Sequence, residues 1–264
     1  MIIDAHAHIN EEGRYKTYFE KAEGKISKVV LMGWYKYDIE EVLSFAAKKE
    51  GLYVIGSVDV GGDIKKQLER LDTLFEEKKI FGIKLCPGYQ FFYPSDKKIY
   101  PIAELCQKYN KPLIFHSGDV YNPEKDAILK YAHPMHIDEL AVKYRKCTII
   151  ISHFGFPYIL ETANIVSKND NVYTDISGTL DACTSQEEME DKLNHYIQDL
   201  KRAFSYFPDV KEKTMFGTDY SGEDTPLREI EPYIKFVQNV FTKEEQENVF
   251  YKLAESVYGL SSGI

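Results

Sequence analysis

Short apolar and β-branched runs alternate with longer segments of helical periodicity along the whole chain. Runs of about four to eight such residues, bounded by turn-forming residues, are typical of buried strands. The pattern predicts eight strands, at 2–8, 28–34, 53–58, 82–86, 112–116, 148–152, 172–176 and 214–219.

The segments between these runs repeat apolar residues every three or four positions, which is the spacing of one helix face. A clear example, over 63–79, consists of Ile64, Leu68, Leu71 and Phe75. A capping-box pattern begins at Asp38 and predicts a helix that runs to Lys49. Further helices are expected at 99–109, 136–145, 156–168, 187–205, 226–240 and 243–257.

Eight strands alternating with helices in 264 residues match a (β/α)8 barrel in both count and length. The competing architecture is a doubly wound open sheet. It would carry a Gly-rich phosphate turn after an early strand, and the sequence has none. We therefore predict an α/β protein with a TIM-barrel fold, in which the whole chain, 1–264, is a single domain.

Composition and charge exclude some classes of function. Hydrophobic residues make up 44% of the chain, enough for a sizeable core, and the net charge is −9. Without a Lys/Arg-rich block, such a surface is a poor partner for nucleic acid. No apolar run is long enough to span a membrane, and the first residues do not resemble a secretory signal. We expect a cytoplasmic protein that acts on a small molecule.

The cysteines are widely spaced and form no C-x-x-C pair; they are Cys86, Cys106, Cys147 and Cys183. Paired cysteines are the usual signature of a structural zinc site, and a chain without an export signal keeps its thiols reduced. We therefore expect four free thiols that serve as small buried hydrophobic residues.

Two histidines, His6 and His8, lie two positions apart on the first predicted strand. A strand directs residues i and i+2 to the same face, so both imidazoles point to one place, as two ligands of one metal ion must. A His-x-His pair alone is weak evidence. It gains weight because His116, His153 and Asp219 each end or follow a later strand. In a barrel, these strand ends meet at the catalytic rim.

Neutral imidazole and carboxylate groups suit zinc and related divalent ions. His116 and Asp219 extend the ligand set offered by His6 and His8. His153 would either ligate a second metal or stand off the metal and handle protons or developing negative charge. The residues alone do not decide between these roles.

Lys84 lies within the fourth predicted strand, where a lysine is costly unless it is paired. Three roles fit it: binding a substrate carboxylate, pairing with Asp219 or another carboxylate, or bridging two metals after carboxylation. A lysine that extends outward past a helix is the alternative without a function.

Aromatic residues follow two strand ends and could form the walls of a partly apolar pocket. Trp34 follows strand two and Tyr89 follows strand four. His133 lies in the connection after strand five, so we keep it as a substrate contact, although packing within the loop is the default for a histidine there. His195 falls within a helical segment and is expected to be an ordinary surface or packing residue.

The order of these motifs resembles the amidohydrolase superfamily, and most of all the amidohydrolase-related group that includes aminocarboxymuconate-semialdehyde and resorcylate-type decarboxylases as well as hydrolases. The resemblance spans nearly the whole chain. It rests on 4–8 (Asp-Ala-His-Ala-His), 82–85, His116, 151–155, 171–177 and 216–220, and on the tail 247–260. In one departure, Cys86 stands where members often carry a histidine.

The resemblance implies that His6, His8, His116 and Asp219 bind a divalent metal, usually zinc, with one ion favoured and two possible. It further implies that His153 is a catalytic or second-metal histidine, and that Asp219 takes a proton from the metal-bound water. Barrels of this group frequently self-associate, so a homo-oligomer is also expected.

Our leading hypothesis is metal-dependent hydrolysis of an amide, ester or lactone. Asp219 would deprotonate the water, and His153 would stabilise the developing oxyanion. The first alternative is metal-dependent, non-oxidative decarboxylation of an unsaturated or aromatic acid. It is less favoured because no arginine stands at a predicted strand end to clamp a carboxylate. The second is a metal-stabilised barrel that only binds ligands.

Overall fold

The computed structural model describes residues 1–120, 126–180, 183, 185–221 and 230–260. In this part of the chain the strands form two parallel sheets, ordered β1-β2-β3 and β4-β5-β6-β7-β8-β9. The strands are β1 (Ile3–Ala7), β2 (Lys28–Leu31), β3 (Leu52–Val54), β4 (Gly56–Ser57), β5 (Ile83–Leu85), β6 (Leu113–Phe115), β7 (Ile149–Ile151), β8 (Val172–Asp175) and β9 (Thr214–Met215).

The two sheets are one closed barrel, because their edges are joined at two places. The Ile55 amide bonds to the Leu31 carbonyl and the Gly56 amide to the Gly82 carbonyl, so β3 and β4 form one strand that passes from β2 to β5. At the other edge, the Ala5 amide donates to the Phe216 carbonyl at 3.0 Å. Eight parallel strands with intervening helices confirm the predicted (β/α)8 barrel.

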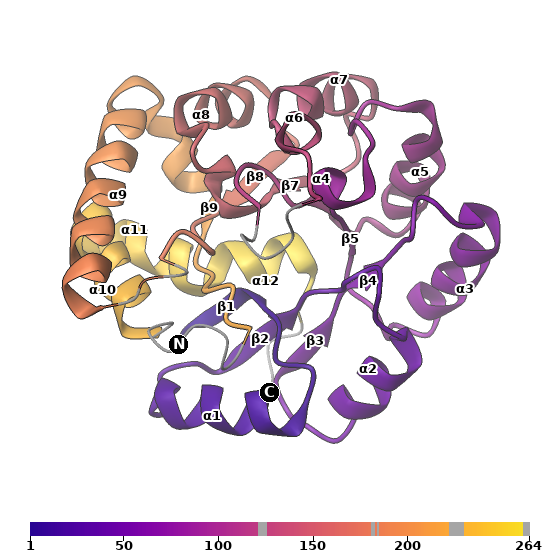
Figure 1. Cartoon of the computed structure of the whole chain (residues 1–264), viewed down its shortest axis with the longest axis horizontal. Helices are drawn as coiled ribbons and strands as arrows, with labels where there is room; N and C mark the ends of the chain where they lie inside the picture. The colour runs from indigo at the N-terminus through magenta and orange to yellow at the C-terminus, as the bar shows by residue number, and fades with distance from the viewer. Residues whose placement is uncertain (121–125, 181–182, 184, 222–229, 261–264) are drawn as a thin grey trace.

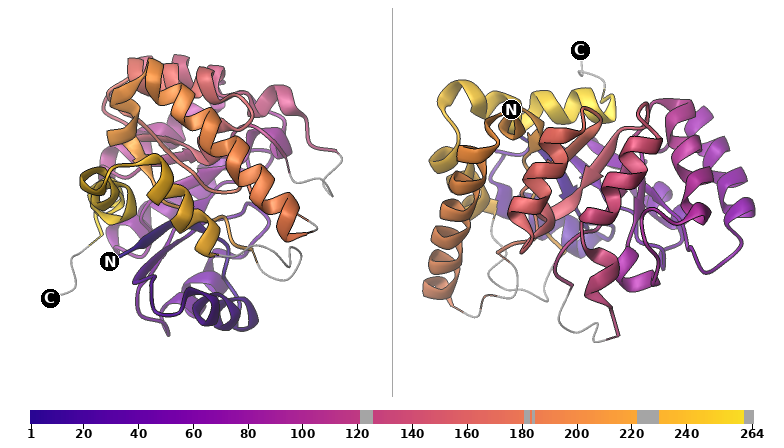
Figure 2. Two further views of the ribbon diagram at one scale, coloured as in Figure 1. Left: turned by 90° about the vertical axis from the view of Figure 1, so that its left-hand side faces the viewer. Right: turned by 90° about the horizontal axis from the view of Figure 1, so that it is seen from above.

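Helices surround the barrel on its outer side and cover one of its ends (Figures 1 and 2). They are α1 (Glu12–Ala22), α2 (Ile39–Ala46), α3 (Ile64–Glu76), α4 (Pro87–Gln90), α5 (Tyr100–Tyr109), α6 (Leu129–Ala132), α7 (Met135–Lys143), α8 (Ile159–Lys168), α9 (Gln186–Tyr206), α10 (Ile230–Val240), α11 (Lys243–Glu247) and α12 (Leu253–Tyr258). Short 3₁₀ or π turns lie at Lys97–Ile99, Ser152–Gly155, Pro208–Lys213 and Asn248–Lys252.

The core has two parts. Apolar residues from six strand positions fill the barrel interior, among them Ile3, Val30, Ile114 and Ile150. Helix α12 lies across one end of the barrel and adds Tyr258 to this interior cluster (Figure 2, right). The larger cluster lies between the strands and the surrounding helices. The end opposite α12 is therefore left for the functional side chains.

Sequence and structure differ at several boundaries. The sequence did not lead us to expect α1, whose first turn contains Gly13 and whose N-cap residue, Glu11, makes no capping hydrogen bond. The last strand was predicted to reach Asp219 but ends at Met215. It ends there because the next amides bond elsewhere: that of Phe216 to Val249, and that of Asp219 to the His6 carbonyl at 2.7 Å.

The helix predicted at 38–49 ends at Ala46, and its cap is simpler than expected. Asp38 accepts a hydrogen bond from the Glu40 amide at 2.9 Å, rather than from the third helical residue as a capping box requires. A complete capping box occurs instead between Thr242 and Glu245 at the start of α11. The predicted helix 226–240 is seen from Ile230 onward, and 226–229 lies outside the described residues.

A β-bulge in β1 orients the histidines. The pairing between β1 and β2 shifts between Asp4 and Ala7, so β1 carries one residue more than its partner there. Ala5 packs in the interior cluster, whereas Ala7 packs in the cluster under the helices. A bulge redirects the side chains that follow it, and bulges are common beside active sites. In a regular strand, successive side chains point to opposite faces. The bulge breaks this alternation, so His6 and its neighbour Ala5 can both point inward.

Candidate metal centre

Three side chains from three distant parts of the chain meet at the C-terminal end of the barrel. His6 belongs to β1, His153 follows β7 and Asp219 follows β9. One ligand atom from each lies within 4.8 Å of the other two. We call His6, His153 and Asp219 the central group.

The other two histidines predicted from sequence contact the central group at its edges. His8 Nε2 lies 3.2 Å from Asp219 Oδ1, the same oxygen that lies 3.3 Å from His6 Nε2. His116 Nδ1 lies 3.1 Å from His153 Nε2, while its own Nε2 lies 2.8 Å from the Asp119 carbonyl oxygen. All five predicted side chains are thus brought together, with His8 and His116 on either side of the three that converge.

The charge state of these side chains suits a cation. Burial lowers the pKa of the His8 imidazole, lowers that of His116 to about 3, and lowers that of His153 well below its usual range, so these rings are neutral at pH 7. Although burial opposes ionisation of Asp219, the imidazoles of His153, His6 and His8 around it hold the pKa of that carboxyl well below its usual range.

Neutral imidazole nitrogens and one carboxylate are the ligand types of a catalytic zinc site. The donors of the central group therefore fit a divalent ion.

Lys84 forms the floor of the site. Its side chain is only 2% exposed, and Nζ donates to Ser152 Oγ at 2.7 Å and lies 3.2 Å from His6 Nε2. Burial lowers the pKa of this lysine. The structure thus places Lys84 inside the barrel beside the central group, and the alternative of an outward-pointing lysine is wrong.

The backbone holds two members of the central group in an unusual conformation. His153 (φ 62°) and Asp219 (φ 59°) both lie in the left-handed region, which residues with a Cβ rarely adopt. Strain of this kind persists only where the surroundings impose it, and it is frequent at functional sites. Here the surroundings are two buried aspartates, Asp4 and Asp175.

Asp4 fixes the position of Asp219. It is fully buried and accepts hydrogen bonds from the Tyr18 hydroxyl at 2.7 Å, from the Thr218 hydroxyl at 2.6 Å and amide at 3.0 Å, and from the His6 amide at 3.1 Å. Its bonds therefore tie β1, helix α1 and the loop after β9 together. Burial raises the pKa of Asp4 to about 6, with these hydrogen bonds acting against the rise.

Asp175 is the residue that our sequence reasoning missed. It ends β8, is fully buried, and lies 3.2 Å from His6 Nδ1 through Oδ2 and 3.0 Å from the His153 amide through Oδ1. The motif 171–177 contributed to the family resemblance, but we assigned no role to its aspartate. An aspartate at the end of a strand, with a serine two positions later, was the available signal.

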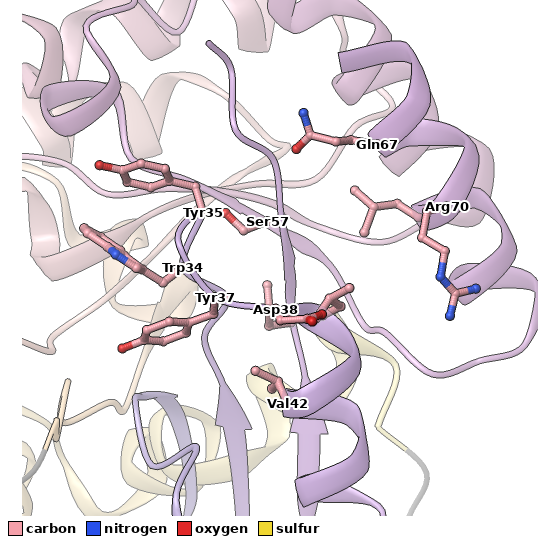
Figure 3. Close-up of a pocket in the computed structure, with 12 residues that line it drawn as sticks. Trp34, Tyr35, Tyr37, Asp38, Val42, Ser57, Gln67 and Arg70 are labelled. Atoms are coloured by element: carbon pink, nitrogen blue, oxygen red, sulfur yellow. The ribbon is translucent and has the colours of Figure 1, made fainter. Parts of the chain in front are cut away.

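A pocket of about 230 Å³ lies between α2 and α3 (Figure 3). Trp34, Tyr35 and Tyr37 line one side of it, and Gln67 and Arg70 come from α3 on the other. An aromatic wall with a few polar groups is typical of a small-molecule site.

Of the three aromatic and histidine residues expected to contact substrate, two lie on a chain of aromatic rings that reaches the centre and one does not. The Trp34 ring lies 5.1 Å from that of Tyr89, which lies 5.1 Å from that of His116, so these aromatic rings connect the pocket with the centre. His133 instead packs on Tyr158 with ring centroids 4.2 Å apart, and it accepts the amide of Met135 at the start of α7. Trp34 and Tyr89 are thus near the centre, whereas His133 contacts neighbouring loops.

We predict that Gly178→Ala disrupts the centre. Gly178 has φ +77°, and an added Cβ would lie 2.6 Å from His153 Nδ1. Metal affinity, measured by competition with a coloured chelator, should fall at least about tenfold, as when partners of metal ligands are changed. Gly24 is the matched control: it has φ +74° and no atom within 4 Å of an added Cβ, so Gly24→Ala carries only the backbone strain. Equal affinities in the two variants would contradict the prediction.

No helix in the described part of the chain is long and apolar enough to cross a membrane. In the same ranges all four cysteines are buried and none forms a disulfide, as predicted.

Comparison with known proteins adds a family match and a set of similar folds. A family model described as amidohydrolase matches residues 3–260. No curated protein sequence gives a significant match.

Several solved structures share the fold over almost their full length. A probable 2-pyrone-4,6-dicarboxylic acid hydrolase from Acinetobacter baumannii with citric acid bound has TM-score 0.69 and 16% identity, covering 98% of this chain and 99% of the other. An amidohydrolase from Burkholderia multivorans with bound zinc has TM-score 0.69 and 13% identity, covering 99% and 100%. A 2,6-dihydroxybenzoate decarboxylase from Rhizobium has TM-score 0.67 and 11% identity, covering 98% of each chain.

Proposed function

This chain belongs to the amidohydrolase family, and from that premise we propose that it is a metal-dependent hydrolase of a small amide, ester or lactone. The observation that carries the proposal is the convergence of His6, His153 and Asp219, with His8 sharing the oxygen of Asp219. The whole chain, 1–264, would act as one catalytic domain.

The proposed cofactor is one divalent ion, zinc, held by the central group together with His8. When bound, such an ion acts as a Lewis acid toward a carbonyl and lowers the pKa of a coordinated water from about 15.7 toward about 7. His116 would act beside them as a further ligand, since its Nδ1 lies 3.1 Å from His153 Nε2.

Asp219 is the proposed general base. Its pKa is held well below the usual range, so it is ionised and able to accept a proton from the attacking water. Its position is set by the neighbouring Thr218, which bonds to Asp4 through both amide and hydroxyl. A carboxylate held this way is oriented before the substrate arrives, which is the geometric requirement for proton transfer.

Lys84 is the proposed donor to a substrate oxygen. Its Nζ already donates to Ser152 at the floor of the site, and a buried nitrogen donor stabilises developing negative charge more strongly than one in water. The pocket lined by Trp34, Tyr35 and Tyr37 would take an apolar or aromatic part of the substrate.

Decarboxylation is the second candidate, and the fold shared with a 2,6-dihydroxybenzoate decarboxylase supports it. That reaction needs a group to hold the departing carboxylate, for which arginine is the common choice. Arg14 and Arg70 are each engaged by a glutamate, Glu11 and Glu40. Hydrolysis makes no such demand, so we place it first.

A substrate panel separates the two reactions. Zinc-loaded protein would be assayed on amides, esters and lactones by product formation, and on aromatic and unsaturated carboxylic acids by release of carbon dioxide. Turnover of the first set that is abolished by chelator is the expected result. Carbon dioxide release without hydrolysis would favour the decarboxylase. Bound zinc with no turnover of either set would contradict both.

We predict one metal ion per chain, and that Lys84→Met keeps it. The three donors of the central group meet at one position, and Lys84 contacts the group through a single nitrogen that donates to its neighbours. Elemental analysis of the purified protein, with and without added zinc, measures the ratio. About two ions in the wild type, falling to about one in Lys84→Met, would instead indicate a carboxylated lysine that bridges two metals.

A further inference from the structure

The carboxylate of Asp175 accepts three hydrogen bonds, and lies against a ring nitrogen of His6, in a place that water does not reach. Oδ1 accepts the amide of His153 at 3.0 Å, the amide of Ser177 at 3.1 Å and the hydroxyl of Ser177, and Oδ2 lies 3.2 Å from His6 Nδ1. Asp175 and Ser177 are both fully buried. Because two amides and one hydroxyl already direct their hydrogens at Oδ1, the carboxylate acts here as an acceptor.

The hydrogen-bond partners around Asp175 and Ser177 determine which ring nitrogen of His153 carries the proton. Its Nδ1 lies 3.2 Å from the carbonyl oxygen of Ser177, and a carbonyl oxygen can only accept. The same Nδ1 lies 2.9 Å from the Ser177 hydroxyl, whose single hydrogen is already donated to Asp175. Both neighbours of Nδ1 thus require a donor. The proton of neutral His153 is on Nδ1, and its Nε2 carries a lone pair. This lone pair faces His116 Nδ1 at 3.1 Å, which is also an acceptor because His116 Nε2 donates to the Asp119 carbonyl oxygen.

The same reasoning applies to His6. Its Nδ1 faces Oδ2 of Asp175, so the proton lies between them on Nδ1. Its Nε2 then carries a lone pair, to which Lys84 Nζ can donate at 3.2 Å. That Nε2 also lies 3.3 Å from Asp219 Oδ1. Acceptors that face one another with no proton between them are the arrangement that a metal cation stabilises.

We propose that Asp175 is a positioning residue that sets the tautomers of two histidines at once, that of His6 by direct contact and that of His153 through the Ser177 hydroxyl. Both rings then present Nε2 as the lone-pair nitrogen toward one cation. Metal-bound histidines commonly have the other ring nitrogen held by a carboxylate or carbonyl. Here a single carboxylate serves two rings from strands that are not neighbours in the barrel, β1 and β7.

The tautomer changes one expectation. From the sequence, His153 was expected to stabilise an oxyanion, which requires an N–H pointing into the site. With its proton directed to Ser177, the neutral ring offers only an acceptor there. Its role is therefore that of a ligand or proton acceptor, and Lys84 is the better placed donor to an oxyanion.

The test reads tautomers directly in the metal-free protein. Long-range ¹H–¹⁵N correlation spectra of ¹⁵N-histidine-labelled protein, recorded at mildly alkaline pH, distinguish the Nδ1–H form, the Nε2–H form and the imidazolium. His6→Ala and His153→Ala assign two of the seven histidines. We expect Nδ1–H forms for His6 and His153. An Nε2–H form or an imidazolium at either residue would overturn the proposal, and this measurement needs no substitution at Asp175 or Ser177.

Two variants separate the direct contact from the relay. Ser177→Ala removes the hydroxyl and leaves the carbonyl oxygen of residue 177, so His153 should lose part of its Nδ1–H population while His6 keeps its own. Asp175→Asn should alter both rings. Zinc affinity should fall about tenfold in Ser177→Ala and about 10- to 100-fold in Asp175→Asn. Thr214→Val is the control. Thr214 is the first residue of β9, and its fully buried hydroxyl donates to the Val210 carbonyl and contacts none of the histidines.

The zinc measurement rests on the proposed function, whereas the tautomer measurement does not. A chain that binds no zinc but shows both Nδ1–H forms would contradict the proposed function and support the inference. A chain that binds zinc with His6 or His153 in the Nε2–H form would overturn the inference alone. An unchanged His153 tautomer in folded Ser177→Ala would overturn the relay.

Discussion

Replacing Asp219 with asparagine is expected to lower kcat/KM by about 10²- to 10⁴-fold, the usual contribution of a general base. The amide has nearly the same shape but cannot accept the proton of the attacking water. The backbone should keep its conformation, because Thr218 and Asp4 hold it through bonds that do not involve the Asp219 side chain. The rate should be measured on a substrate identified by the panel.

Asp219 also belongs to the central group, so zinc content must be measured on the same preparation. At saturating zinc, a fall in kcat with the metal retained indicates the loss of a base. Asp191→Asn on the exposed face of α9 is the control, since it removes the same charge from a residue outside the central group. A value of kcat/KM within a few-fold of the wild type would contradict the assignment of Asp219 as the base.

The second large effect is expected from His6→Ala, which should abolish stoichiometric zinc binding. His6 contacts Asp175 on one side and Asp219 and Lys84 on the other, so its ring connects the buried network with the central group. Without the ring, activity should fall about 10³-fold or more, because a bound ion supplies several kcal/mol of transition-state stabilisation. Asp175 would lose one buried donor, at a cost of about 1–3 kcal/mol in the free energy of unfolding.

Elemental analysis and chemical denaturation measure the two consequences separately. His195→Ala is the matched control, because His195 lies on an exposed position of α9. It should keep both the zinc and the stability of the wild type. Zinc retained at the wild-type ratio in His6→Ala would exclude His6 as a ligand, whatever the activity.

The fold was largely predictable because its signals are local. Each of the eight strands lies within a short apolar run, and each apolar run is about as long as a strand needs to be to cross a barrel. The helix that was missed, α1, has a weak local signal, with Gly13 in its first turn and an uncapped start. Its stability comes from packing instead, since Tyr18 is buried and bonds to Asp4.

The candidate site was predictable in its members but not in its arrangement. Residue type and strand-end position identified His6, His8, His116, His153 and Asp219. Their shared end of the barrel follows from the parallel topology. The parallel topology does not determine which of these side chains converge, because that depends on the left-handed conformations of His153 and Asp219. Their roles as ligands and catalytic groups stay predictions.

The sequence by itself determined the barrel, the family and the set of metal-binding residue types, because strand periodicity and side-chain chemistry are properties of short segments. Only the tertiary structure decided the bulge in β1 that directs His6 inward, and the burial of Asp4 and Asp175 beneath the central group. Partners of these two carboxylates that are distant in the chain come from α1, β1 and the segments after β7 and β9. Hydrogen bonds between residues so far apart in the chain exist only once the barrel has closed, so no local pattern can encode them.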